Sequence, residues 1–573
     1  MTYTWNIQTL TEQDQQTCRL LERELSITPA AARMLVMRGI VTPDEARQYI
    51  RPRLEDLNDP YLMRDMSQAV ERLNRALLRG EHIMVYGDYD VDGTTAVALM
   101  FTFLRQLSTR IHFYIPDRYT EGYGISFKGI DEAQALGCTL IVALDCGIKA
   151  VDKVEYATQR NIDFIICDHH TPGDTIPAAV AVLNMKRKDC PYPYKELSGC
   201  GVGFKLVQAL ARHRGIPDER WQSLLPLLAM SIASDIVPIT GENRILAYYG
   251  LKYMNAHPSI GLSSILKVAG LEGKQITISD LVYKIGPRIN ASGRMHSGAE
   301  AVRLLIADNP EEAQARAVDV DSYNVERREF DTTTTEEALA MLRQDPNNDQ
   351  LHTTVVYNPS WHKGVVGIAA SRLTETYYRP TIVFTGGEGD IISGSARSVG
   401  GFDLYTAIDS CRDLLTNFGG HQFAAGLSLH LKDLPEFKRR FEEFVAAHIL
   451  PEQMQPTITI EQQIQFADID AKFFNILKHL EPFGPGNPRP IFCTRNVINN
   501  RYTKRVGKAG EHLKLDVTDR TAAITGIAFG QGDTALWLQN GNAIDLCYEL
   551  DENTFNGSTS IQMMVLDIKP LQK

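Results

Sequence analysis

The sequence predicts an α/β protein with a parallel-sheet domain, a smaller second α/β domain joined to it by a long helix, and a C-terminal all-β unit. From about residue 67 to 260, β-rich apolar runs alternate with amphipathic segments, as in a mostly parallel sheet covered on both faces by helices. The apolar run TTVVYN, from Thr353, opens the second α/β domain. After Pro456, alternating strand-like runs with Gly and Asn turns indicate a small barrel.

Five segments follow from these patterns. Residues 1–60 read as helical, and Thr42, Pro43 and Glu45 are typical of a helix start. The other segments are the parallel-sheet domain at 61–308, a charged connecting helix at 309–348, the second α/β domain at 349–450, and an OB-like barrel at 451–573. A pair of surface helices is an alternative interpretation of the connector.

Composition is that of an ordinary globular protein. The formal charge of −11 argues against a nucleic-acid partner, but a metal-binding acidic cluster would contribute part of it. No apolar run is long enough to span a bilayer, and MTYTWNIQ lacks the features of a secretion leader, so we expect a cytoplasmic protein without membrane contact. The nine cysteines form no CxxC pair, which favours buried thiols over disulfides or thiolate zinc.

Acidic residues close the predicted strands. The runs HIMVYGDYDVDG, TLIVALDCGI and DFIICDHH each end in Asp or in Asp followed by His, and SIASDIVPI adds a fourth acidic segment that we also treat as a strand end. Ligands of open α/β sheets gather at the carboxyl ends of the strands. The side chains expected to converge there are Asp88, Asp90, Asp92, Asp145, Asp168, His169, His170 and Asp235.

This convergence predicts a divalent metal centre. Carboxylates that share a small volume raise one another's pKa, and burial adds to the cost, so a cation is the simplest remedy. Oxygen ligands with one or two imidazoles suit Mn²⁺ or Mg²⁺ better than zinc. Two ions would explain the number of carboxylates, with Asp145 as a bridging ligand. An Asp-Gly strand end alone is more often a plain turn, and a lone His more often a core residue.

The motifs resemble those of the DHH phosphoesterase superfamily, and more closely its RecJ family of single-strand-specific 5′→3′ DNA exonucleases. The matching motifs, in order, are YGDYDVDGTTA, ALDCGI, DHH, SIASDIVPI, GPRINASGRM and the DHHA1-type NFGGHQFAAG. The resemblance implies a DHH domain, a DHHA1 domain and an OB-like barrel. It places Asp88, Asp90, Asp145, His169 and Asp235 at metal-binding positions, and leaves Asp92 and His170 as either ligands or supporting residues.

The resemblance also implies substrate-binding residues. These are Arg118, Arg288, Asn290, Arg294, Ser395, Arg397 and His421. Ser395 and Arg397 match the family's pocket for a 5′-terminal phosphate, and His421 a histidine that contacts phosphate near the metals. Arginine suits phosphate, although any one of these arginines alone reads equally as a surface or ion-pair residue. In the C-terminal unit, RYTKRVGK combines charge with Tyr502, as a single-strand groove requires, or forms a solvated hairpin.

We therefore expect a monomeric exonuclease that degrades single-stranded DNA from its 5′ end to mononucleotides with two Mn²⁺ or Mg²⁺ ions. The resemblance implies roles in recombination, DNA repair and mismatch repair, with single-strand-binding protein and a RecQ-like helicase as partners. A DHH phosphodiesterase for short oligonucleotides or cyclic dinucleotides is one alternative, disfavoured by the barrel. A non-catalytic replication scaffold is another, disfavoured by the intact acidic and His positions.

Overall fold

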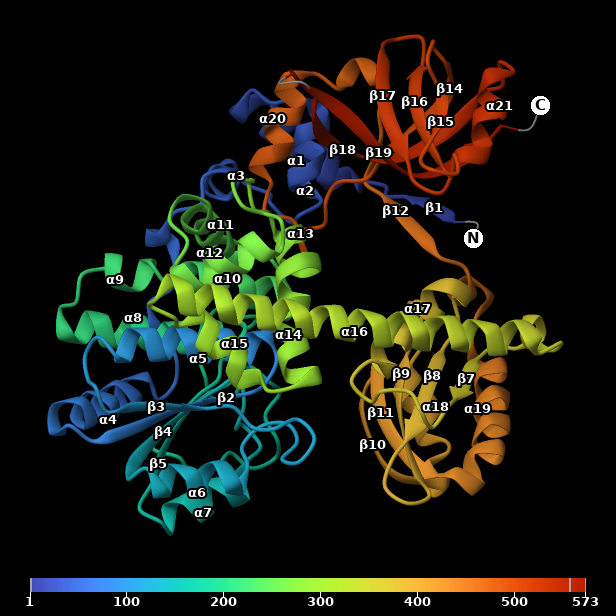
Figure 1. Ribbon diagram of the computed structural model, residues 1–573. Coiled ribbons are helices and arrows are strands. Elements are labelled where there is room, and N and C mark those ends of the chain that lie inside the picture. The colour runs from blue at the N-terminus through green and yellow to red at the C-terminus, as the bar shows by residue number, and fades with distance from the viewer. Residues whose placement is uncertain (1–2, 556–557, 572–573) are drawn as a thin grey trace. The chain divides into compact units, whose positions relative to one another are not determined.

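The chain folds into two compact units in the computed structural model, which describes residues 3–555 and 558–571 (Figure 1). One unit comprises residues 57–455, and the other combines the N-terminal residues up to Asp56 with those from Pro456 onward. The first unit contains two sheets joined by a long helix, and the second contains the barrel. This is the predicted α/β fold class.

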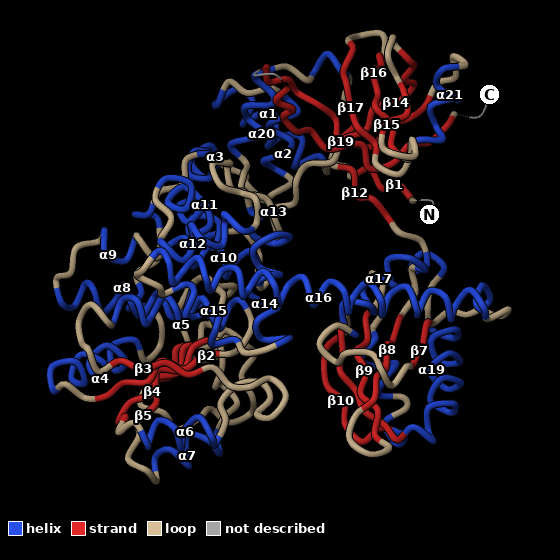
Figure 2. The backbone as a smooth tube through the Cα atoms, in the orientation of Figure 1, coloured by secondary structure: helices blue, strands red, loops and turns tan. Residues whose placement is uncertain are grey.

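The first sheet has five parallel strands in the order β3-β2-β4-β5-β6. Its strands are β2 (His82–Gly87), β3 (Ile111–Tyr114), β4 (Cys138–Leu144), β5 (Asp163–Cys167) and β6 (Ala181–Leu183). Helices lie on both faces (Figure 2), and they are α4 (Met66–Arg79), α5 (Val91–Leu104), α6 (Phe127–Ala135), α7 (Val151–Thr158) and α8 (Gly199–Arg214). The strand order reverses between β2 and β4, which makes their carboxyl ends the expected ligand crevice.

A helical layer follows this sheet. It consists of α9 (Glu219–Gln222), α10 (Leu225–Ser234), α11 (Gly241–Ala256), α12 (Ile260–Val268), α13 (Ile278–Asp280), the π-helix η3 (Leu281–Ile285), α14 (Gly286–Met295) and α15 (Gly298–Leu305). The charged connector is one continuous 35-residue helix, α16 (Pro310–Gln344), and not a pair of helices. It packs against α12 and α14 on one side and α17 (Val366–Tyr377) on the other.

The second sheet has the order β10-β11-β9-β8-β7. Its strands are β7 (Thr354–Tyr357), β8 (Thr381–Gly386), β9 (Ile391–Arg397), β10 (Leu415–His421) and β11 (Ala424–His430), and its other helices are α18 (Leu404–Asp409) and α19 (Leu434–His448). Only β7 and β8 pair in parallel. Apolar side chains of α18 and α19 form the core on one face, and those of α16 and α17 on the other.

The other unit is built around a closed circuit of strands, because β14 pairs with both β18 and β16. Its barrel elements are β12 (Thr457–Ile460), β13 (Gln462–Gln463), α20 (Ala471–His479), β14 (Phe492–Asn499), β15 (Lys504–Val506), β16 (His512–Thr518), β17 (Ala523–Ala528), α21 (Ala535–Gln539), β18 (Ile544–Phe555) and β19 (Ser558–Pro570). Such closure is typical of an OB-like barrel.

The N-terminal segment belongs to this barrel unit, whereas the sequence placed it apart. Helices α1 (Glu12–Leu25), α2 (Pro29–Val36) and α3 (Pro43–Ile50) share an apolar core with the barrel that includes Leu35 and Phe473. The segment also begins with a strand, β1 (Thr4–Ile7), which pairs in parallel with β12. Sequence periodicity found the helices, but not the strand or the distant partner, because both depend on residues more than 400 positions away.

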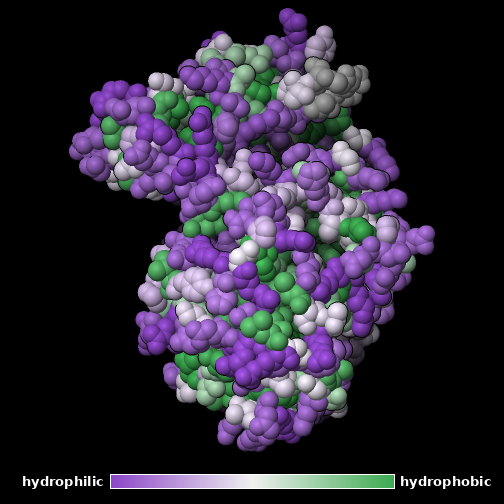
Figure 3. All heavy atoms as spheres, turned by 90° about the vertical axis from the view of Figure 1, so that its left-hand side faces the viewer, coloured by the Kyte–Doolittle hydropathy of each residue, from purple (hydrophilic) through white to green (hydrophobic). Residues whose placement is uncertain are grey.

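The face drawn in Figure 3 is mixed in character: hydrophilic residues predominate on it, and apolar residues form separate patches. Among the described residues, no helix combines the length and apolar character that crossing a membrane requires.

Candidate metal centre and phosphate site

The DYDVDG segment turns directly into a helix. Asp88 follows β2, Asp90 is the N-cap of α5 and accepts a hydrogen bond from Gly93 N at 3.0 Å, and Asp92 lies in the first helical turn. Helix α5 therefore begins at Val91, directly after the cap. The Asp90 side chain satisfies a backbone N–H of the first turn, which stabilises this start.

Asp92 is fixed by the start of another helix. Its carboxylate accepts hydrogen bonds from Gly199 N at 2.6 Å, Cys200 N at 2.8 Å and Ser231 Oγ at 2.7 Å. These donors come from α8 and α10, so the side chain ties α5 to two neighbouring helices. Negative charge is favourable at the N-terminus of α8, which helps to explain why a buried carboxylate is tolerated here.

Asp145 follows β4 in a left-handed backbone conformation, with φ of +58°. Its Oδ1 atom lies 3.3 Å from His169 Nε2 and has no hydrogen-bond partner among the described residues. A Cβ atom at residue 199 would lie 2.7 Å from the Cα atom of Asp145, so only glycine fits there. The backbone therefore directs Asp145 inward at the end of the strand.

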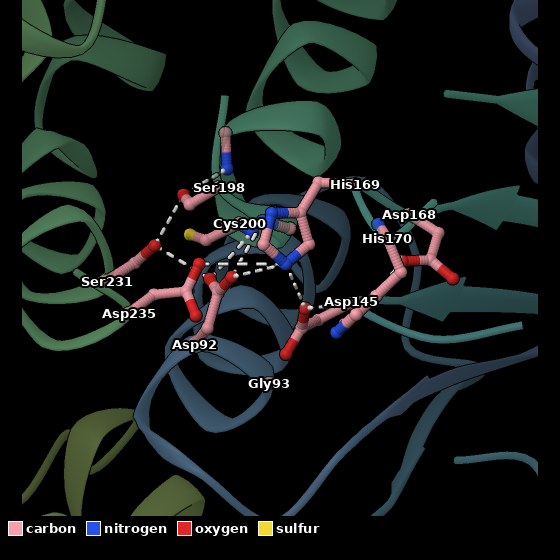
Figure 4. Close-up of polar contacts among 12 residues, drawn as sticks. Asp92, Gly93, Asp145, Asp168, His169, His170, Ser198, Cys200, Ser231 and Asp235 are labelled. Atoms are coloured by element: carbon pink, nitrogen blue, oxygen red, sulfur yellow. Dashed lines mark hydrogen bonds and ion pairs between the residues drawn. The ribbon is translucent and has the colours of Figure 1, made fainter. Parts of the chain in front are cut away.

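His169 lies at the centre of the acidic cluster. Its Nε2 atom is 3.3 Å from Asp145, 3.6 Å from Asp235 and 3.9 Å from Asp92. Figure 4 shows the ring between these carboxylates. Neither ring nitrogen has a hydrogen-bond partner within the described chain. Burial lowers the pKa of His169, so the ring is neutral and keeps a lone pair that a metal ion can use.

His170 is held by Asp168. The carboxylate accepts from His170 N at 3.0 Å and pairs with His170 Nδ1 at 2.8 Å, while its other oxygen accepts from Ile148 N. Burial lowers the pKa of His170, but the hydrogen bond and charge of Asp168 outweigh it, and the net pKa is raised. Asp168 is thus fully engaged in orienting His170, whose Nε2 lies 3.2 Å from Tyr123 Oη.

Asp235 comes from a helix end, which corrects the expectation of a fourth strand end. It is the C-cap of α10, and its Oδ2 atom has no hydrogen-bond partner in the described structure. The next residue, Ile236, has φ of +60°, a conformation that costs an L-residue about 1–2 kcal/mol. The apolar run SIAS continues a buried helix, and periodicity alone does not separate such a helix from a buried strand.

Two groups have ligand atoms that all lie within 4.8 Å of one another. They are Asp145, His169 and His170, and Asp92, His169 and Asp235. Asp92 and His170, whose roles the sequence left open, belong to these groups, whereas Asp88 and Asp90 do not. Asp88 accepts from Gly124 N at 3.3 Å with one oxygen and leaves the other, Oδ2, without a partner among the described residues. As metal ligands, Asp88 and Asp90 stay a prediction.

The electrostatics of the cluster favour a bound cation. Burial, and then the charge of Asp90, raises the pKa of Asp88 to about 8. Burial, and then Asp92, raises the pKa of Asp235 to about 9, and the same two causes raise the pKa of Asp145 well above its ordinary value. Carboxylate oxygens with a neutral imidazole form a donor set that fits Mn²⁺ or Mg²⁺. The buried oxygens without partners point to the same ligand.

Comparisons with known proteins agree along the whole chain. Family models match at residues 82–232 (DHH family, N-terminal domain), 348–447 (DHHA1 domain) and 460–567 (RecJ OB domain). The single-stranded-DNA-specific exonuclease RecJ of Bacillus subtilis (strain 168) is 35% identical over 98% of this chain and 70% of its own length. RecJ of Escherichia coli (strain K12) is 34% identical over 95% and 96%.

The chain belongs to the RecJ family.

Solved structures of the family also match. The crystal structure of RecJ in complex with Mn²⁺ from Thermus thermophilus superposes with a TM-score of 0.84 and 28% identity, covering 100% of this chain and 80% of that one. The fold described above, including the barrel, is therefore the RecJ fold.

Within this RecJ-family fold, several of the predicted phosphate-binding arginines lie together. Arg294 donates to Gly364 O at 2.9 Å, and Arg397 donates to Ser395 Oγ at 3.0 Å. Arg118 lies over the Tyr89 ring, 4.8 Å from its centroid. Burial, and then the charge of Arg118, lowers the pKa of Arg294 to about 10, and Arg327 and Arg397 add to this effect. Several guanidinium groups close together favour the binding of an anion.

Arg288, Asn290 and His421 are placed differently. Arg288 is buried and donates to Asp321 Oδ1 at 2.8 Å, so it is already paired with a carboxylate of α16. Asn290 is half-buried on α14. His421 is exposed at the end of β10, where its Nδ1 accepts from Phe423 N at 3.2 Å. The described contacts do not bring His421 to the metal centre, and its predicted role stays a prediction.

Sequence reasoning missed several supporting residues. Gly199 and Ser231 shape and hold the acidic cluster, and Arg327 of α16 joins the arginine group. The run SGCGVG contained a signal for a close backbone approach, because clustered glycines at a helix start often allow one. Arg327 carried no signal, since it lies in a helix with charges on all sides.

Proposed function

We propose that this chain hydrolyses single-stranded DNA from its 5′ end with the aid of two divalent ions, Mn²⁺ or Mg²⁺, and releases 5′-mononucleotides. The observation that carries the proposal is the set of buried carboxylate and imidazole atoms without partners around His169. The relatives' name, single-stranded-DNA-specific exonuclease, supports the substrate. The Mn²⁺ and Mg²⁺ complexes of the Thermus thermophilus protein support the cofactor.

The residues that would hold the ions are Asp88, Asp90, Asp145, His169 and Asp235. Of these, Asp145, His169 and Asp235 belong to the two groups described above, as do Asp92 and His170. When bound, the ions supply a hydroxide at neutral pH and stabilise the attacking and leaving oxygens. Asp145 would be a ligand, because its Oδ1 has no hydrogen-bond partner among the described residues and lies near both histidines. Asp168 fixes the His170 ring through Nδ1, which leaves Nε2, 3.2 Å from Tyr123 Oη, as the nitrogen that would donate to a phosphate oxygen.

The arginine group would hold the 5′-terminal phosphate and so set the polarity. Arg397 and Ser395 lie at the end of β9, close to Gly367 in the first turn of α17. A Cβ atom at residue 367 would lie 3.0 Å from Arg397 Nη2 and 3.0 Å from Ser395 Oγ. Glycine thus lets the helix approach these side chains closely. Arg288 would support this site by anchoring α14 to α16, since its Nε donates to Asp321 Oδ1 and its Nη1 to Lys284 O.

The barrel unit would bind the strand through its charge and its exposed aromatic rings. Lys504 of β15 lies directly opposite Lys514 of β16, and both are exposed. Like charges at such a pair are unfavourable unless an anion lies between them. Tyr502 is 73% exposed and Phe529 is 59% exposed, which leaves their rings free to stack on bases.

A salt titration tests the barrel's role. Changing Lys504 and Lys514 to Gln together should reduce the slope of log affinity against log salt by about 1.4, because each phosphate contact contributes about 0.7 on single strands. The control Lys472→Gln removes a charge from α20 in the same unit and should leave the slope unchanged. An unchanged slope in the double variant would contradict the proposed contact of Lys504 and Lys514 with the strand.

Further roles rest on family resemblance. We propose that the chain acts in DNA recombination, repair and mismatch repair as a cytoplasmic monomer, with single-strand-binding protein and a RecQ-like helicase as partners. Gel filtration of the pure protein, and co-elution with each partner, test the oligomeric state and the two interactions separately.

The central test is Mn²⁺-dependent nucleotide release from single-stranded DNA by the wild-type chain and by Asp145→Ala. We expect release by the wild type and none by the variant, which should remain folded. Wild-type-like release by Asp145→Ala would contradict the metal centre. Absence of metal-dependent release by the wild type would favour a non-catalytic scaffold. A preference for strands of two to four nucleotides over long ones would favour a short-oligonucleotide phosphodiesterase.

A further inference from the structure

Ile236 exposes an apolar side chain at the edge of the metal centre. It follows Asp235, whose Oδ2 atom lies 3.6 Å from His169 Nε2, and it is 69% exposed. The next residue, Val237, is buried. The chain thus presents one branched aliphatic side chain to solvent beside a cluster of carboxylates, where polar side chains would be the ordinary choice.

The backbone conformation makes an isoleucine at this position more unusual. Ile236 has φ of +60° and follows the C-cap of α10, a position that glycine fills in most helices of this type. Among the described residues that are not glycine and have positive φ, Ile236 is the only β-branched one. Its two γ-carbons crowd the backbone in this region, whereas glycine would end the helix at the same place without that crowding.

Packing within the protein does not compensate for the strained conformation. A side chain that is 69% exposed buries little apolar surface, so its burial stabilises the fold only slightly. Residues held in strained backbone conformations cluster at active sites and ligand-binding sites. A ligand that covers Ile236 would bury its exposed side chain.

We propose that Ile236 contacts the nucleobase next to the phosphate that is cleaved. This inference rests on the proposed function, because a nucleotide is the ligand that combines a phosphate for the metals with a flat apolar surface one residue away. The contact is independent of base identity, since every base has an apolar face. Ile236 is therefore a substrate-binding residue that aligns the strand at Asp235 without reading sequence.

The test couples a change in the protein to a change in the DNA. Ile236→Gly and Ile236→Asn remove the aliphatic side chain, and both residues accept positive φ, so the fold should persist. We expect kcat/KM on a natural single strand to fall about tenfold, mainly through KM, as loss of one buried aliphatic contact predicts. The rise in melting temperature that Mn²⁺ causes should remain in both variants.

The same assays are then run on a strand whose first two 5′ nucleotides are abasic tetrahydrofuran residues. The ratio of the wild-type kcat/KM to that of the variant should fall from about tenfold on the natural strand to below about twofold on the abasic strand, because the base that contacts Ile236 is missing. Val318→Ala, a change at an exposed aliphatic residue of α16, should behave as wild type on both strands.

Three results would overturn the inference. One is a variant that cleaves the natural strand as fast as the wild type. Another is a tenfold lower kcat/KM of the variant on the abasic strand as well as on the natural one, which would mean that Ile236 only positions Asp235. The third is a wild-type chain that cleaves neither strand, in which case the proposed function fails and this inference fails with it.

Discussion

Gly199 leaves the space that Asp145 occupies: a Cβ atom at residue 199 would lie 2.7 Å from the Cα atom of Asp145. The same glycine donates its N–H to Asp92 at 2.6 Å. One residue at the start of α8 therefore fixes two carboxylates of the metal centre. Gly199 contributes to both effects through its backbone alone.

Gly199→Ala should displace Asp145 and weaken metal binding. We expect a loss of about 10- to 100-fold in apparent Mn²⁺ affinity, the range seen when residues that support metal ligands are changed. Isothermal titration of the metal-free protein measures it. Gly201→Ala is the matched control, because its Cβ atom would meet nothing closer than 3.3 Å. Equal affinities in the two variants would contradict the steric argument.

Asp145→Asn should stabilise the metal-free protein while abolishing cleavage. Burial and the charges of Asp92 and Asp90 raise the pKa of Asp145, so an ionised carboxylate there opposes folding. A neutral amide of the same shape removes that cost, so we expect the melting temperature to rise. Thermal unfolding in EDTA measures it. Asp174→Asn, at an exposed position of the loop after the DHH motif, should change little. A lower melting temperature for Asp145→Asn than for the wild type would contradict the proposed repulsion among the buried carboxylates.

The metal-free wild type should lose stability as pH rises. The folded pKa values of Asp88 and Asp235 are about 8 and 9, compared with 3.8 for an unperturbed Asp. The stability that these two carboxyls contribute is fully present below about pH 4 and is lost as pH rises toward 9, because over this range the folded state keeps protons that the unfolded chain has released. With saturating Mn²⁺ the loss of stability with rising pH should become smaller or turn into a gain, since the metal ions replace those protons. Melting temperatures from pH 5 to 9, with Mn²⁺ and with EDTA, decide the matter. Parallel curves would contradict the prediction.

Arg397→Gln should impair cleavage of strands that carry a 5′-phosphate far more than strands that end in a hydroxyl. Loss of charge-assisted hydrogen bonds to the phosphate predicts a drop of about 10- to 100-fold in kcat/KM on the phosphorylated strand. Gly367→Ala should have a smaller effect in the same direction, because its Cβ atom crowds Arg397 and Ser395. Arg412→Gln, an exposed arginine of the same domain, is the control. Equal losses of kcat/KM on 5′-phosphorylated and 5′-hydroxyl strands would contradict the placement of Arg397 in the phosphate pocket.

Sequence patterns were sufficient for the parallel sheet and for most of the acidic cluster around His169. Apolar runs that stop at an acid placed Asp145 and Asp168 correctly at the ends of β4 and β5. Strand alternation in the last 120 residues predicted the barrel. These features depend on neighbours in the chain, which periodicity reports directly.

The remaining features depend on contacts between distant residues. Asp235 comes from a helix because α10 is buried on all sides, and such a helix has the same apolar pattern as a buried strand. Asp168 was expected in the crevice, but three hydrogen bonds commit it to His170 and Ile148. The pairing of β1 with β12 joins residues about 450 apart, which no local pattern encodes.

The most direct test of metal-dependent cleavage from the 5′ end follows the label released from end-labelled single strands incubated with Mn²⁺. A 5′ label should appear at once as a mononucleotide, whereas a 3′ label should pass through progressively shorter strands, and Asp145→Asn should release neither. Cleavage that begins at the 3′ end, or that continues in EDTA or in Asp145→Asn, would contradict the metal-dependent 5′ exonuclease.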